Sequence, residues 1–124
     1  MLYMEKAREP LSSFSHFIGA VAFALATVLL VGKTLVVGQW SIKILIGVVI
    51  FGLSLVALYS ASAIYHFSNG SAKRILRLRK LDHSMIYVLI AGSYTPILLK
   101  YLPQRESLVF VTVIWACAAI GTII

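Results

Sequence analysis

Long apolar runs separated by short polar connections make up most of this chain. Crossing the hydrocarbon core of a bilayer takes about 20 residues of helix, and backbone polar groups in that layer must be paired within the segment itself. Each run therefore predicts a membrane-spanning helix, the third with the help of its flanks. The four runs are Phe14–Gly32, Ile42–Phe67, His83–Leu99 and Ser107–Ile124. The pattern predicts an all-α protein, a polytopic transmembrane helical bundle with about four spans in a single domain over residues 1–124.

Composition supports a membrane protein and argues against a nucleic-acid-binding one. Apolar residues make up 60% of the chain and charged residues 12%, which is typical of membrane proteins. The net charge of +7 would also suit nucleic acid, but no zinc finger or aromatic-rich strand accompanies it. Basic residues between spans more often set topology and face anionic lipid. We expect membrane lipids as partners and no nucleic acid.

The basic residues are distributed unevenly between the connections. Lys6 and Arg8 precede the first run, and five more follow the second run: Lys73, Arg74, Arg77, Arg79 and Lys80. The positive-inside rule predicts a multi-pass plasma-membrane protein whose N-terminus and 73–80 connection are cytoplasmic. The segment Lys73–Lys80 is expected to form a short interfacial helix that contacts anionic lipid headgroups. Trp40 suits the opposite interface.

Polar side chains at the ends of two apolar runs are the candidate chemistry. Ser62 and His66 are four residues apart, so they share one face of a helix. A helical hairpin would return Asp82 to the same side of the membrane as His66. Polar groups in such segments usually pair, line a cavity or bind a ligand. An imidazole can bind a metal, a carboxylate can deprotonate bound water, and a hydroxyl can hydrogen-bond either one.

Two further histidines leave an alternative metal site open. Three histidines are the ligand set of some catalytic zinc sites, and spacing alone allows one from His16, His66 and His83. Asp82 and His83, however, are adjacent and point about 100° apart on a helix, which disfavours both facing one metal. For His16, an interfacial or hydrogen-bonding role is the simpler interpretation.

Three sequence blocks carry a family resemblance. They resemble bacterial hemolysin III proteins, which belong with the progestin and adipoQ receptors in a wider group that includes alkaline ceramidases. The blocks are REPLSSFSHFIGA (8–20), SASAIYHFSNG (60–70) and LRKLDHSMIYVLIAGSYTP (78–96). The resemblance covers essentially the whole chain and implies seven transmembrane helices with a zinc ion near their cytoplasmic ends. It also implies that His66, in Ser-x-x-x-His with Ser62, binds zinc, and that Asp82 lies beside the zinc-bound water.

The family pattern also includes one motif that this sequence matches in part and another that this sequence lacks. The first motif, a glutamate, an asparagine and then Ser/Thr-His, matches Glu9, Ser15 and His16, with Ser12 where the asparagine is usual. The family's two other zinc ligands lie in a His-x-x-x-His motif on the seventh helix, which this sequence lacks, and the chain ends in apolar sequence. We therefore expect the N-terminal half of a longer protein, inactive alone and binding zinc weakly or not at all.

Two hypotheses for the intact protein follow. In the first it is a zinc-dependent hydrolase of a lipid amide or ester, with His66 on zinc, Asp82 as the base and Ser62 orienting water or stabilising charge. In the second it is a non-enzymatic membrane protein with structural zinc, either a hemolysin-like permeabiliser with toxin activity or a lipid-sensing regulator. A chain this uniformly apolar is expected to reside in the membrane, unlike a secreted toxin.

Overall fold

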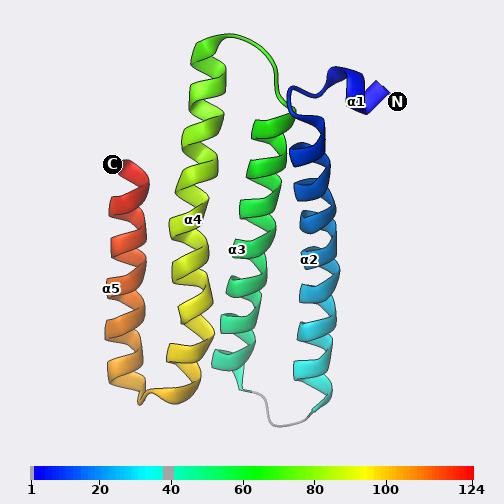
Figure 1. Cartoon of the computed structure of the whole chain (residues 1–124). Coiled ribbons are helices and arrows are strands. Elements are labelled where there is room, and N and C mark those ends of the chain that lie inside the picture. Colours follow the sequence, from blue (N-terminus) through cyan, green and yellow to red (C-terminus); the bar gives the residue numbers. More distant parts are fainter. Residues whose placement is uncertain (1, 38–40) are drawn as a thin grey trace.

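The chain folds into four long antiparallel helices preceded by a short one. The computed structural model describes residues 2–37 and 41–124, so the expectation for Trp40 lies outside the described residues. The elements are α1 (Leu2–Lys6), α2 (Pro10–Val36), α3 (Ile42–Phe67), α4 (Ala72–Tyr101) and α5 (Gln104–Ile123). Figure 1 shows the long helices side by side with alternating directions. Among the described residues, extensive contacts join only helices that are consecutive in the chain, so the bundle is an open row.

The predicted all-α class is confirmed, and most predicted spans match helices. The run Ile42–Phe67 coincides with α3, and α2 and α5 extend the first and last runs by a few residues. The separate interfacial helix predicted over Lys73–Lys80 is wrong, because α4 runs without a break from Ala72. Residues 72–82 contain good helix formers and neither glycine nor proline, so nothing ends the helix before its apolar part begins.

Three of the long helices are apolar and long enough to cross a membrane, and the fourth connects their ends. The three are α2, α3 and α5. The charged first turns of α4 lower its hydropathy, yet α4 returns the chain from the end of α3 to the start of α5 at the opposite end of the bundle (Figure 1). α4 therefore runs alongside the three candidate spans, and the chain is a multi-pass membrane protein.

Local signals in the sequence fix the helix ends around the α3–α4 connection. The Ser71 hydroxyl accepts a hydrogen bond from the backbone N–H of Arg74 at 3.2 Å and so caps α4. Gly70 has a φ of +138°, which a residue with a side chain rarely adopts. The connection therefore turns sharply, and the first turns of α4 project beyond the end of α3 in Figure 1.

Small residues bring α3 and α4 into close contact. Gly47 lies against the backbone of Pro96, and a Cβ atom on Gly47 would come within 2.6 Å of the Pro96 Cα. Further along the pair, Gly92 lies against the Ser54 side chain. Helices in a bilayer associate through such van der Waals packing because lipid is as apolar as leucine. The two contacts fix the register of α3 against α4.

Replacing Gly47 by alanine is predicted to destabilise the α3–α4 contact. The added methyl group meets a backbone atom that cannot rotate away, and overpacking of this kind costs about 1–3 kcal/mol. Unfolding of the purified protein in mixed micelles measures the change. Gly32→Ala is the matched control, because a Cβ there meets nothing within 4 Å and alanine favours a helix by up to about 1 kcal/mol. Equal stability of Gly47→Ala and the unsubstituted protein would contradict the contact.

Candidate functional site

A histidine and a serine join α2 to α3 near the end of the bundle that holds the α3–α4 connection. His16 on α2 and Ser62 on α3 share a hydrogen bond between Nδ1 and Oγ, 2.6 Å apart. Ser62 is buried, and the His16 ring meets the ring of Tyr59 edge-on at 5.7 Å between centroids. His16 therefore has a hydrogen-bonding role between two helices, beside the other candidate residues.

His66 lies one turn beyond Ser62, next to His16. The two imidazole centroids are 5.4 Å apart. The Nδ1 atom of His66 is 3.2 Å from the Oε1 atom of Glu9, but the two are not aligned as a hydrogen bond, so this buried nitrogen has no hydrogen-bond partner among the described residues. A buried polar atom without a partner costs free energy. Because Nδ1 lies beside the Glu9 carboxylate, a further ligand of this imidazole would bind to its other nitrogen, Nε2.

The segment before α2 closes the exposed end of α3, a feature that the sequence reasoning missed. The backbone N–H groups of Arg8 and Glu9 donate to α3 carbonyl oxygens at 3.1 and 2.8 Å, and the Arg8 guanidinium donates to two more at 2.8 and 3.1 Å. The accepting carbonyls belong to Tyr65, His66, Phe67 and Ser68. The last carbonyls of a helix have no partner inside it, so this segment caps α3 from outside.

Asp82 lies level with Ser62 and on the same face of the α3–α4 pair. From the contact of Ser54 with Gly92, Ser62 is eight residues forward along α3 and Asp82 ten residues back along α4. A helix turns by about 100° and rises by about 1.5 Å per residue. Relative to the Ser54–Gly92 contact, Ser62 and Asp82 are each rotated by about 80° in the same sense about their own helix axis. Their heights along the bundle differ by about 3 Å. In an antiparallel pair, equal rotation puts both residues on one face. Within the described residues, Asp82 has no hydrogen bond or ion pair from its side chain.

His83 lies elsewhere, so the structure does not bring the three histidines together. It lines a cavity between α4 and α5 together with Tyr87 and Thr122, whereas His16 and His66 lie at the α2–α3 contact. Asp82 and His83 are adjacent in sequence, and the helix turns them toward different neighbours. In the part of the chain that the structure describes, no three His, Cys, Asp or Glu side chains are grouped closely enough to hold a metal.

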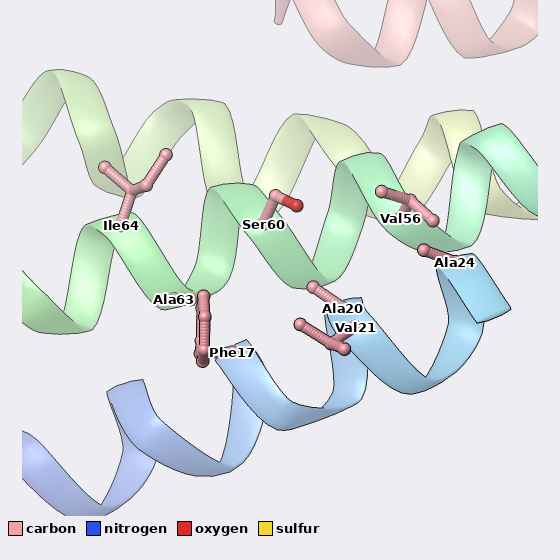
Figure 2. Close-up of a pocket in the computed structure, with 8 residues that line it drawn as sticks. All are labelled: Phe17, Ala20, Val21, Ala24, Val56, Ser60, Ala63 and Ile64. Carbon is pink, nitrogen blue, oxygen red and sulfur yellow. The ribbon is translucent and has the colours of Figure 1, made fainter.

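The cavity on the other side of the α2–α3 pair contains no chemistry of this kind. It is an apolar groove of about 400 Å³, shown in Figure 2, with Ser60 as its one hydroxyl. Ser60 precedes Ser62 by two residues, which is about 200° on a helix. The groove and the histidine cluster therefore lie on opposite faces, and the candidate chemistry is confined to the face with His16, His66 and Asp82.

Comparisons with known proteins now decide the family. The model of the family described as "Haemolysin-III related" matches residues 4–124. The chain belongs to the haemolysin-III related family. It is 34% identical over 114 residues to the hemolysin-3 homolog of Bacillus subtilis (strain 168) and 32% identical over 113 residues to the hemolysin-3 of Bacillus cereus. No solved structure matches the chain.

The match covers most of this chain but only part of each relative. The alignments span 90% of the chain in both cases, and 51% and 50% of the two relatives. This haemolysin-III related chain therefore spans about half the length of the curated relatives it matches. Its described residues contribute one cluster of two imidazoles, a carboxylate and a hydroxyl, with Asp82 on the same face.

The hydrogen bond between His16 and Ser62 predicts energetic coupling between the two side chains. A double-mutant cycle with His16→Ala and Ser62→Ala is expected to give a coupling of about 0.5–1.5 kcal/mol in the free energy of unfolding, the net worth of a protein hydrogen bond. Ser60→Ala is the matched control, because Ser60 faces the apolar groove. Its cycle with His16→Ala should show no coupling. The same coupling in both cycles would contradict the assigned bond.

Proposed function

We propose that the intact protein is a zinc-dependent hydrolase of a lipid amide or ester, with its reaction centre at the end of the bundle where α3 ends. The observation that carries the proposal is the cluster of His16, Ser62 and His66 with Glu9, on the face that also holds Asp82. Such residues inside a membrane protein are expensive to keep unless they serve a site. The family resemblance points to the same chemistry.

The residues of this chain fit one part of a zinc site. His66 supplies a half-buried imidazole, which is a suitable ligand through the nitrogen that does not face Glu9. His16 already uses its Nδ1 atom on Ser62. Catalytic zinc takes three protein ligands, so further ligands would come from beyond this chain. When bound, zinc would act as a Lewis acid and make water a better nucleophile at neutral pH.

The other residues of the cluster have separate roles in this proposal. Asp82 takes a proton from the attacking water while the water oxygen forms a bond to the carbonyl carbon of the lipid. The carbon–nitrogen or carbon–oxygen bond then breaks, and the proton passes to the leaving amine or alcohol. Ser62 shares its hydroxyl with His16 and keeps two further hydrogen-bonding positions, one of which orients the water.

The protein would sit in the plasma membrane with this cluster near the cytoplasmic face. Of the eleven basic residues, seven lie at the end of the bundle that holds the N-terminus and the start of α4. A hydrogen bond from the Asn69 side chain to the Lys6 carbonyl joins these two segments. The positive-inside rule assigns such an end to the cytoplasm. There the exposed basic residues of Lys73–Lys80 would contact anionic lipid headgroups.

The orientation predicts which end of the bundle is accessible from outside the cell. In a Cys117→Ser background, which removes the single native cysteine, Arg77→Cys should resist an impermeant thiol reagent in intact cells and react after permeabilisation. Gln104→Cys, at the opposite end, is the matched control and should react in both conditions. Both positions are exposed in the structure. If Arg77→Cys reacted in intact cells and Gln104→Cys did not, the predicted orientation would be contradicted in favour of the opposite one.

The names of the relatives give a specific reason to keep a second candidate. Both matched proteins are named as hemolysins, so the intact protein would in this case permeabilise membranes, or regulate in response to lipid, with zinc in a structural role. Permeabilisation would increase with protein density in the bilayer. It would not depend on a proton acceptor at Asp82.

Asp82→Asn is expected to abolish turnover and leave zinc content and folding unchanged, because it removes a base but no ligand. The protein extended to the length of its relatives would be assayed for fatty-acid release from amide and ester lipids, and for zinc by elemental analysis. His66→Ala should lose both zinc and turnover. Glu106→Gln, at the other end of the bundle, is the matched control and should lose neither.

Three results would contradict parts of the proposal. Turnover that survives Asp82→Asn would remove the role of Asp82. About one zinc per chain in the 124-residue form would show that the local residues suffice and that no further ligands are needed. Dye leakage from vesicles that is unaffected by Asp82→Asn, with no turnover of any lipid, would favour the permeabiliser.

A further inference from the structure

We infer that Glu9 is a positioning residue, held by Arg8, that sets which ring nitrogen of His66 is free to bind a ligand. The inference rests on the proposed function only for the identity of the ligand as zinc. The assignment of the imidazole proton stands on the geometry of this chain alone. The sequence marks Glu9 only as part of a motif and gives no sign that it reaches His66, which is 57 residues away in the sequence.

Glu9 is attached to His66 at two points. Its backbone N–H donates to the His66 carbonyl oxygen at 2.8 Å, and its Oε1 atom lies 3.2 Å from the His66 Nδ1 atom. The same Oε1 atom is 2.6 Å from a guanidinium nitrogen of Arg8. The carboxylate side chain, which is 41% exposed, therefore lies between a permanent cation and the imidazole. The backbone hydrogen bond keeps Glu9 next to His66.

The carboxylate decides where a neutral imidazole carries its proton. A lone pair on Nδ1 would lie near a negative oxygen at 3.2 Å and be destabilised, whereas an N–H there is stabilised by the same charge without being aligned as a hydrogen bond. His66 therefore carries its proton on Nδ1 and keeps the lone pair on Nε2. Histidines that bind metals commonly have their other nitrogen next to a carboxylate, which orients the ring and raises its basicity.

Arg8 holds the carboxylate in place and joins it to the end of α3. Its guanidinium donates to the carbonyls of Tyr65 and Ser68 and lies over the Tyr65 ring, 4.7 Å from the centroid. A cation at the C-terminal end of a helix is favoured by the helix dipole. Because these contacts orient Arg8, a Glu9 side chain that turned to solvent would lose its ion pair with Arg8. The two residues act together on His66.

The proton position is measurable by nitrogen NMR without any metal. The 124-residue chain would be labelled with ¹⁵N-histidine in lipid nanodiscs, at a pH about two units above the ordinary histidine pKa. The signals of His66 are those that His66→Ala removes. We expect protonated Nδ1 and unprotonated Nε2 in the unsubstituted chain. In Glu9→Ala, the proton should move to Nε2 in the larger share of molecules.

Two control variants separate this role from a purely structural one. Glu5→Ala removes the other N-terminal glutamate, which is exposed, and should leave the His66 signals unchanged. Glu9→Gln keeps the size of the side chain and thus the fold, but a neutral amide no longer repels a lone pair on Nδ1, so the preference should weaken as in Glu9→Ala. If Glu9 only stabilised the fold, its substitution would lower the melting temperature and leave the proton on Nδ1 of His66. Identical His66 signals in the unsubstituted chain, Glu9→Ala and Glu9→Gln would overturn the inference.

Zinc binding gives the second measurement and separates this inference from the proposed function. In the protein extended to the length of its relatives, Glu9→Ala should weaken zinc binding about 10- to 100-fold, and Glu5→Ala should not weaken it. A proton shift without zinc binding in any form would support the positioning role and refute the hydrolase. Zinc binding that depends on His66 but not on Glu9, with no proton shift, would refute the positioning role alone.

Discussion

The end of α3 imposes the constraint on which the candidate site depends. A helix that ends close to the hydrocarbon layer leaves its last carbonyl groups without partners, and water cannot fully replace them there. In this protein Arg8 and Glu9 supply those partners from a segment that is far away in the sequence. The same two residues bring a carboxylate to His66. The same segment therefore caps the end of α3 and places a carboxylate beside the His66 imidazole.

The open row of helices gives the chain two different faces. On one face an apolar groove between α2 and α3 contains a single hydroxyl, shown in Figure 2. Many large apolar side chains of the bundle are exposed, as lipid contact allows. On the other face lie the histidine cluster and Asp82. The separation follows from helix rotation, because residues two positions apart, such as Ser60 and Ser62, point in nearly opposite directions. Close approach at glycine residues keeps the helices in register, so the polar residues of α3 and α4 remain level.

Membership in the haemolysin-III related family and the geometry of the cluster support each other. The family match extends over residues 4–124, and both the N-terminal segment and α3 contribute to the cluster. The described residues bring together an imidazole and a nearby carboxylate, which are too few to close the proposed metal site. Since the chain spans about half of its relatives, the proposed division of the site between this chain and further sequence is a consistent physical account.

The sequence by itself determined the fold class, because the periodicity and length of apolar runs follow directly from the bilayer. It also indicated that Ser62 and His66 share a face, since four residues nearly complete a helical turn. The interfacial helix failed because residues 72–82 favour a helix as strongly as the span they precede, and hydropathy alone cannot show that the two are continuous. Only the tertiary structure decided that His83 faces α5, that His16 bonds Ser62, and that Arg8 and Glu9 close α3. These contacts join residues far apart in the chain, and their partners depend on the rotation and register of whole helices, which local sequence does not encode.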